Sequence, residues 1–389
     1  MRSRLFVFIS IIQSILFLGH WLLYVTLSAF WGGPASSLAM KIAIALLSIS
    51  FVSASLRAWY SHHWLVRLWY SVAATWLGVA SYFLWASLLC WIVYAVSRIA
   101  GLGWNPSYIA DVIFGAALLT AIYGILNAAK LRITRVSITL PKLPLSWRGR
   151  VAALVSDMHL GHVRNGRFIR RLVGKLQDLR PDVIFLAGDL YDGTSADFKK
   201  LAEPWRAITY SPTNGAGHSS QTPQSSNGSS SPGLGVFYIA GNHEEFYGSA
   251  EYHGPLVDAG VRELNNQKVD VDGLQVVGVH YRDAAHPERY GQILREAAID
   301  RDKASVLLLH APVNLHVAEA EGISLQLSGH THGGQFFPYT WIAGRVWGKL
   351  IHGLARVGKL QVFTNYGAGT WGPPLRVGTY PEIVLITFV

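Results

Sequence analysis

The sequence Leu327-Ser328-Gly329-His330-Thr331-His332-Gly333-Gly334-Gln335 is the part around which the second half of the chain is organised. His330 and His332 are two residues apart, so an extended backbone directs both imidazole rings to the same side. An apolar run over residues 323–327 precedes them and predicts a strand. Neutral imidazole is a common protein ligand for transition metals. This stretch therefore predicts a metal site at the end of a strand.

Upstream apolar runs of strand length end in residues of the same kind. They are Val151–Val155 with Asp157 and His159, Val183–Leu186 with Asp189 and Asp192, Val236–Ile239 with Asn242, His243 and Glu244, and Val306–Leu309 with His310. Sites in open α/β sheets form at the carboxyl ends of strands, so we expect these side chains to converge. Carboxylate, amide and imidazole donors without thiolate suit Mn, Fe, Zn or Co. They outnumber the ligands that one ion needs, which predicts two ions sharing a bridging carboxylate.

The chain as a whole is too apolar for an ordinary soluble protein, and its long apolar runs lie in the first third. Of the 389 residues, 51% are hydrophobic and only 14% are charged, and the mean hydropathy is +0.27. Four apolar runs are each long enough for the roughly 20 residues that cross a bilayer. They are Leu5–Phe30, Ser37–Leu56, Tyr70–Val96 and Ile109–Leu131. We therefore predict an all-α region of four transmembrane helices over residues 1–131.

The distribution of basic residues predicts the orientation of these helices. Cations gather at the N-terminus, in the second loop and after the fourth helix, at Arg2, Arg4, Arg57, Arg67, Lys130, Arg132 and Arg135. Because basic residues favour the cytoplasmic side, the region after the fourth helix is expected in the cytoplasm. His20 and Asp111 are the plausible ionisable groups within the helices, and we interpret both as hydrogen-bonded or interfacial. The helices are then an anchor rather than a channel or carrier.

Residues 132–389 show a different pattern. Short apolar runs alternate with amphipathic stretches, which predicts an α/β layered fold. Apolar residues recur at helical spacing from Phe168 to Leu179, and further strands are expected at Val276–Val279 and Ile383–Phe388. Residues 211–233 are rich in Ser, Gly, Pro, Asn and Gln and carry no apolar period. We expect a disordered insert there.

The net charge of +10 raises the question of a nucleic-acid partner. The second region contains no dense block of Lys and Arg with interleaved aromatic residues, and much of the basic excess flanks the apolar runs. Anionic lipid is therefore the simpler partner, and no nucleic-acid partner is expected. The single cysteine, Cys90, lies in an apolar run and excludes an intrachain disulfide.

The motifs from Val151 to the C-terminus resemble the calcineurin-like metallophosphoesterases. They read D-x-H, G-D-x-x-D, G-N-H-E, H and G-H-T-H in this order. Four apolar runs followed by this region, and the stretch from Asn365 to Arg376, look like the membrane-anchored branch of that family. The resemblance implies a four-layer sandwich of two mixed sheets flanked by helices.

The resemblance also implies a role for each site residue. Asp157, His159 and His332 are expected to bind one metal, Asn242, His310 and His330 to bind the other, and Asp189 to bridge the two. His243 is expected beside the scissile phosphate, where it stabilises or protonates the leaving oxygen. Asp192 and Glu244 are expected to support the ligands rather than bind metal.

These expectations describe a membrane-anchored phosphoesterase that hydrolyses a phosphodiester, phosphomonoester or pyrophosphate bond with metal-activated water. Relatives suggest a lipid-linked substrate. Two alternatives remain: a tethered hydrolase of soluble nucleotides or phosphoproteins, and a metal-binding membrane sensor or scaffold without turnover.

Residues 336–356 mix aromatic residues such as Trp341 and Trp347 with Arg345, Lys349 and Arg356. This composition suits a membrane interface. The alternative is a loop or hairpin that packs on the domain. An interfacial segment would lie beside the site, because His332 is a few residues upstream, and would favour a lipid-bearing substrate.

Overall fold

The structure, a computed structural model, describes residues 2–209, 233–247 and 249–389 and divides the chain into two compact units. Unit 1 comprises Met1–Ala129 and Gly372–Val377, and unit 2 comprises Lys130–Trp371 and Gly378–Val389. The boundary expected after residue 131 lies close to this division. Apart from its last residue, the insert expected at 211–233 lies outside the described residues.

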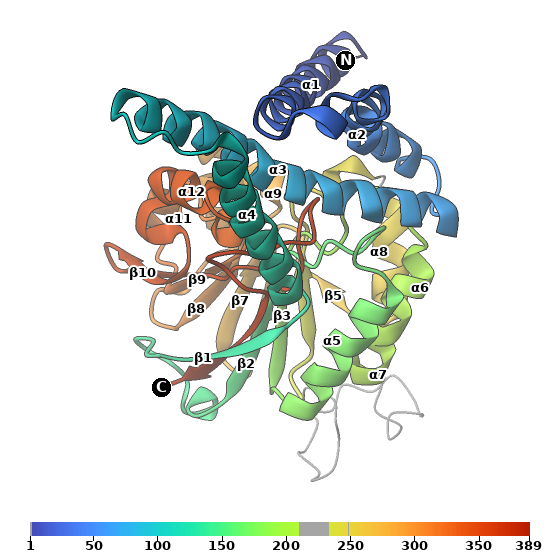
Figure 1. Cartoon of the computed structure of the whole chain (residues 1–389). Helices are drawn as coiled ribbons and strands as arrows, with labels where there is room; N and C mark the ends of the chain where they lie inside the picture. The colour runs from blue at the N-terminus through green and yellow to red at the C-terminus, as the bar shows by residue number, and fades with distance from the viewer. Residues whose placement is uncertain (1, 210–232, 248) are drawn as a thin grey trace. The chain divides into compact units, whose positions relative to one another are not determined.

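Unit 1 is built from four long helices. They are α1 (Arg2–Trp31), α2 (Leu38–Ala58), α3 (Trp64–Ile99) and α4 (Pro106–Ala128), with a short 3₁₀ turn at Gly33–Ser36 between the first two (Figure 1). Local capping fixes where the last begins, because the Asn105 side chain accepts from the Ser107 N–H and Pro106 occupies the first turn. All four are long and apolar enough to cross a membrane, which confirms the four predicted apolar helices.

His20 and Asp111, the two ionisable side chains that the sequence singled out within these helices, are both hydrogen-bonded. His20 Nδ1 lies 2.7 Å from the carbonyl oxygen of Leu16, and its Nε2 lies 2.9 Å from the indole nitrogen of Trp76. A carbonyl only accepts and an indole N–H only donates, so His20 is held as the neutral Nδ1–H tautomer. Asp111 accepts from the Trp31 indole at 2.9 Å. These bonds agree with the interpretation of both groups as structural.

Unit 1 also contains the segment Gly372–Val377, which is distant in sequence from the helices. The Arg376 N–H donates to the Gly124 carbonyl at 2.9 Å, and the Asn127 amide donates to the Arg376 carbonyl at 3.0 Å. A Cβ atom at Gly124 would lie 2.8 Å from the Leu375 side chain. Glycine on α4 therefore makes the room that this segment occupies.

Unit 2 contains two mixed six-stranded sheets. The first sheet, in spatial order, is β1 (Arg132–Ile138), β12 (Glu382–Phe388), β2 (Val151–Val155), β3 (Val183–Ala187), β4 (Val236–Ile239) and β5 (Arg262–Glu263). The second is β10 (Gly353–Val357), β11 (Leu360–Thr364), β9 (Leu325–Ser328), β8 (Ser305–Leu308), β7 (Leu274–Gly278) and β6 (Gln267–Val271). Each sheet contains four neighbouring parallel strands: β2, β3, β4 and β5 in the first, and β11, β9, β8 and β7 in the second.

The helices of unit 2 cover the outer faces of these sheets (Figure 1). These helices are α5 (Gly166–Leu179), α6 (Phe198–Ala202), α7 (Arg206–Thr209), α8 (Ser249–Asp258), α9 (Tyr281–Ala284), α10 (Pro287–Glu296) and α11 (Leu315–Ala320); the exception is α12 (Tyr339–Trp347), which has no buried residue. Strand alternation separates the layers: Ala153 and Val155 pack toward α5, whereas Ala152 and Leu154 pack between the sheets. The predicted four-layer α/β sandwich is confirmed.

Some elements escaped the sequence prediction. Residues 339–347 form the helix α12, which the sequence analysis did not expect, and residues 353–357 form the edge strand β10, which pairs with β11 as one arm of a hairpin. Short edge strands such as β5, β6 and β10 carry polar residues among few apolar ones, which weakens the alternating signal that reveals a strand.

Candidate metal centre

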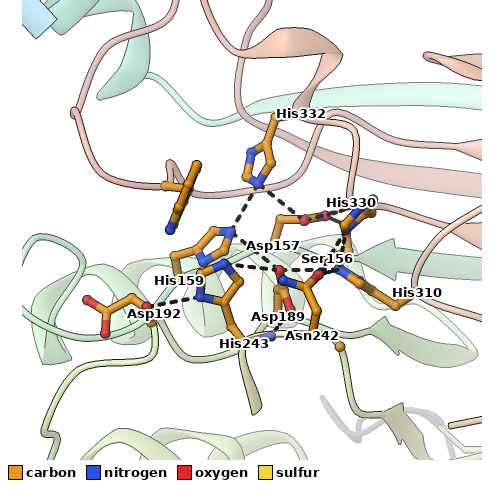
Figure 2. A network of polar contacts seen from close by, with 12 residues as sticks. Ser156, Asp157, His159, Asp189, Asp192, Asn242, His243, His310, His330 and His332 are labelled. Carbon is orange, nitrogen blue, oxygen red and sulfur yellow. Dashed lines mark hydrogen bonds and ion pairs between the residues drawn. The ribbon is translucent and has the colours of Figure 1, made fainter. Parts of the chain in front are cut away.

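The site residues follow the carboxyl ends of five strands. Asp157 and His159 follow β2, Asp189 follows β3, Asn242 and His243 follow β4, His310 follows β8, and His330 and His332 follow β9. Within each sheet these strands are parallel neighbours, so their carboxyl ends share one edge. The structure brings together all the side chains for which the sequence predicted a metal-binding role (Figure 2).

The first donor group contains Asp157, His159 and His332. The Nε2 atoms of His159 and His332 lie 3.0 Å apart, although the two residues are 173 positions apart in sequence. His332 Nε2 also lies 3.3 Å from an Asp157 carboxylate oxygen. Figure 2 shows the two imidazole rings directed toward each other, with Asp157 beside them.

The second donor group contains Asn242, His310 and His330. The Asn242 side-chain oxygen lies 2.9 Å from His330 Nδ1 and 3.2 Å from His310 Nε2. Asp189 connects the two groups, because its Oδ2 atom lies 3.2 Å from His310 Nε2 and 3.8 Å from His159 Nε2. Asp189 thus has the position that a bridging ligand requires.

The spacing of these donor atoms tests whether metal ions fit. Two ligands at right angles on one ion, with bonds of about 2.1 Å, lie about 3 Å apart. The separations of 3.0 Å for His159 with His332 and 3.2 Å for His310 with His330 match that value. These imidazoles are buried or nearly so, and within the described part of the chain the ion-pair partners of Asp157 and Asp189 are histidines. The donor set therefore fits two transition-metal ions.

In the metal-free centre, the pKa values of the two histidines in the second donor group shift in opposite directions. Burial alone disfavours a charged His310, but the adjacent Asp189 carboxylate outweighs it and raises the pKa of His310 to about 10. Burial and the nearby His310 lower the pKa of His330 to about 4. The pKa of Asp189 is lowered, because His310 and two further histidines outweigh the effect of its burial. Of the two histidines, His310 therefore carries the proton, opposite the Asp189 carboxylate.

His243 lies beside both groups. Its Nδ1 atom lies 3.0 Å from the backbone carbonyl of Asp192, so this nitrogen carries the proton and donates. The other nitrogen, Nε2, then faces the centre and lies 3.9 Å from Asp189 Oδ2. The ring is largely buried, with 8% of the residue exposed. This geometry leaves Nε2 available to a bound molecule.

Asp192 and Glu244 do not face the donor groups. The Asp192 carboxylate accepts from the N–H groups of His162 and Thr194 and from the Thr194 hydroxyl. Glu244 accepts from three backbone N–H groups, those of Asp189, Gly241 and Tyr191, at 2.7–3.0 Å. Burial and the Asp189 charge raise the pKa of Glu244 to about 7. Both carboxylates therefore hold the loops that carry the ligands.

The ligand loops are conformationally strained. Of the seven predicted metal ligands, five have positive φ angles of 48–72°: Asp157, His159, Asp189, His330 and His332. This conformation costs a non-glycine residue about 1–2 kcal/mol, and such outliers cluster at functional sites. Neighbouring glycines provide the space, since a Cβ at Gly241 would lie 2.2 Å from Asp189 Oδ1 and one at Gly329 would lie 2.1 Å from Asp157 Oδ2.

Several residues near the centre were not singled out as site residues from the sequence. The Ser156 hydroxyl contacts the Asp157 carboxylate and lies 2.5 Å from the Asn365 side-chain oxygen. Asn365 follows β11, so a further strand end contributes to the site. Its position directly after an apolar run was the available signal.

Aromatic rings surround the centre. Tyr281 and Trp347 each lie 5.7 Å from the His330 ring, and Trp371 and Phe246 lie 5.7 and 5.6 Å from the His243 ring. Trp371 and Phe246 remain 58% and 53% exposed. The side of the centre next to His243 is thus bordered by accessible apolar surface.

Two adjoining donor groups at the strand ends of a four-layer sandwich define a metallophosphoesterase domain. Residues 151–334 match the family model described as calcineurin-like phosphoesterase. The chain therefore contains a domain of the calcineurin-like metallophosphoesterase family.

Known proteins with similar sequences carry corresponding names. An uncharacterized metallophosphoesterase of Campylobacter jejuni is 30% identical over 67% of this chain and 64% of its own length. A zebrafish (Danio rerio) transmembrane protein with metallophosphoesterase domain is 29% identical over 68% of this chain and 59% of its own length. An uncharacterized metallophosphoesterase of Aquifex aeolicus is 27% identical over 70% of this chain and 97% of its own length. The chain thus spans slightly less than two thirds of the first two.

Proposed function

We propose that this protein is a membrane-anchored phosphoesterase with two metal ions, hydrolysing a phosphodiester, phosphomonoester or pyrophosphate bond. The convergence of the two donor groups around Asp189, with His243 beside them, carries the proposal. Asp157, His159 and His332 would hold one ion, Asn242, His310 and His330 the other, and Asp189 both. When bound, such a pair of ions supplies an activated water and neutralises charge on phosphoryl oxygens.

The residues of the chain supply orientation and proton transfer. The Asp192 carbonyl fixes the Nδ1–H tautomer of His243, so its Nε2 is directed to a phosphate held at the centre. In the protonated state, Nε2–H donates to the leaving oxygen as the P–O bond breaks. Glu244 accepts hydrogen bonds from backbone N–H groups in the loops after β3 and β4, which fixes the position of Asp189 relative to His243.

We propose a lipid-linked phosphoester or pyrophosphate as the substrate. The exposed Trp371 and Phe246 beside His243, and Trp347 beside His330, offer apolar contacts next to the position of the phosphate. Replacing Trp341 and Trp347 with Ala should lower turnover of a lipid substrate and leave turnover of a small chromogenic diester unchanged. Equal losses on the two substrates would rule out this assignment.

The helices of unit 1 are proposed to cross the bilayer as a multi-pass anchor, with the catalytic domain in the cytoplasm. The apolar length of the helices supports the first part. The second rests on the basic residues at the N-terminus, in the second loop and after α4. A protease-accessibility assay on sealed vesicles of known orientation tests it, and protection of unit 2 in inside-out vesicles would reverse the assignment.

The activity is tested with protein purified in detergent and loaded with Mn, Zn, Fe or Mg. The substrates are bis-p-nitrophenyl phosphate, a phosphomonoester, a soluble nucleotide and a lipid pyrophosphate. Preference for the lipid supports the proposal, and preference for the nucleotide identifies a tethered hydrolase of soluble substrates. Folded, metal-loaded protein with no activity on any of them would instead identify a metal-binding sensor.

A further inference from the structure

The helix α12 presents an apolar face to solvent. None of its nine residues is buried, and its large side chains are among the most exposed apolar residues of unit 2. Trp341 is 60% exposed, Ile342 48% and Val346 71%, and the preceding Phe337 is 57% exposed. Positions 342 and 346 are one helical turn apart, so they share a face. We call Phe337, Trp341, Ile342 and Val346 the α12 surface.

The surroundings of the α12 surface are basic. Residues 336–360 contain no Asp or Glu and include Arg345, Lys349, Arg356 and Lys359. Within the described part of the chain, none of these four cations forms an ion pair with a carboxylate. The Arg345 guanidinium lies over the Trp341 ring at 4.7 Å, so a positive charge and an aromatic ring lie side by side on this surface.

We propose that the α12 surface docks on the surface of an anionic lipid bilayer. A bilayer interface accepts apolar and indole side chains at the level of the acyl boundary and cations at the level of the phosphates, and this segment offers both. A nucleic acid would engage the cations but leave Phe337, Ile342 and Val346 exposed to water. A bilayer is also the partner that the rest of the chain favours, because the same chain carries four helices long and apolar enough to cross one.

Docking would bring lipid to the metal centre. Trp347, the last residue of α12, lies 5.7 Å from the ring of His330 in an edge-on contact, and it directly follows Val346. The residue that contacts a metal ligand and the residue that would enter the interface are therefore neighbours on one helix. The proposal deepens the proposed lipid-linked function and rests on its membrane anchorage, but its test does not depend on catalysis.

The single cysteine of the chain makes a direct test possible. In a Cys90→Ala background, Val346→Cys is labelled with an environment-sensitive fluorophore, and the full chain is reconstituted in nanodiscs that contain nitroxide-labelled lipid. Leu145→Cys is the matched control, since Leu145 is 78% exposed and also lies in unit 2. We expect strong quenching at position 346 and little at position 145. Equal quenching at both positions, or none at 346, would overturn the proposal.

The anionic character of the partner is tested by lipid composition and charge. Quenching at position 346 is expected to be stronger in phosphatidylcholine mixed with phosphatidylglycerol than in phosphatidylcholine alone. Each cation contributes about fivefold to binding at an anionic surface. Arg345→Glu with Lys349→Glu should therefore reduce the quenching, whereas Arg167→Glu with Arg170→Glu on α5 should leave it unchanged. If neither the phosphatidylglycerol content nor the charge reversals at positions 345 and 349 change the quenching, the partner is not an anionic surface.

Failure of the catalytic proposal would look different. Protein without activity on any substrate, but with quenching at position 346, would keep the docking surface and reject the phosphoesterase. Protein that alkaline carbonate extracts from membranes would reject the anchorage, and the docking proposal with it.

Discussion

The Nδ1 atom of His243 lies 3.0 Å from the backbone carbonyl oxygen of Asp192, and this bond sets the tautomer of the histidine closest to both donor groups. The sequence predicted a supporting role for Asp192, and a carboxylate would be the usual partner for such a histidine. Here the carboxylate instead binds Thr194 and His162, and the main chain orients the ring. The two functions of Asp192 can therefore be separated by substitution.

We predict that His243→Gln lowers kcat by about 10²- to 10⁴-fold on an alkyl phosphodiester, the range for a lost general acid. The loss should be much smaller with a p-nitrophenyl leaving group, which needs no proton to depart. Steady-state kinetics on both substrates, with metal content measured in the same samples, check this. Equal losses on both would assign His243 to metal binding instead.

Asp192→Asn is the matched control for that prediction. The substitution keeps the backbone carbonyl, and Asn can still accept from the Thr194 N–H. Burial raises the pKa of Asp192, so a neutral side chain is tolerated at this position. We expect kcat within about tenfold of the parent protein, because general acid catalysis by His243 is retained.

Close approach of the ligand loops makes a second prediction. Gly241→Ala would place a methyl group 2.2 Å from Asp189 Oδ1 and 2.5 Å from the Asp189 nitrogen, so Asp189 must move. We expect loss of bound metal and of activity. The control, Gly174→Ala, lies within α5 with nothing within 4 Å of the new atom, and should raise stability by about 1 kcal/mol. Elemental analysis and thermal unfolding of both variants test the contrast.

Asp189 itself provides a third prediction. Its carboxylate oxygen lies near His159 of one donor group and near His310 of the other. Asp189→Asn removes the charge that both ions would share, so we expect both to be lost together. A substitution in one group only, His332→Ala, should release one ion and keep part of the second. Metal stoichiometry of the purified variants distinguishes them, and a single ion retained by Asp189→Asn would argue against bridging.

The layers and the ligands were predictable from the sequence because both come from strong local patterns. A buried parallel strand is a continuous apolar run, and a ligand directly after such a run is visible without any structure. His310 after β8 and Asp189 after β3 are examples. The short edge strands β5 and β10 were not predictable, because they contain few apolar residues and several of their side chains face solvent.

Contacts between distant segments were also out of reach. That Gly372–Val377 belongs to unit 1 depends on the space left by Gly124, and nothing in either stretch alone indicates the pairing. The same holds for the Asp192 carbonyl beneath His243, because a backbone atom leaves no residue type to recognise. Sequence patterns show which side chains carry chemistry, whereas packing decides what orients them.

The proton held by His310 makes the metal-free protein sensitive to pH. The pKa of His310 is raised to about 10 in the folded state, mainly by Asp189 acting against burial, from an ordinary value near 6.5 in the unfolded chain. A raised histidine pKa contributes stability that is fully present below about pH 6.5 and is lost as the pH rises through about 10. The free energy of unfolding in chelator should therefore fall over this window, by at most about 1.4 kcal/mol per pH unit for one proton. Thermal unfolding between these limits measures the slope.

Added metal must displace the same proton from His310, so the affinity of the centre for metal should rise with pH over the same range. His310→Asn should flatten the stability profile, and a wild-type profile that is already flat would show that the Asp189–His310 pair does not hold this proton.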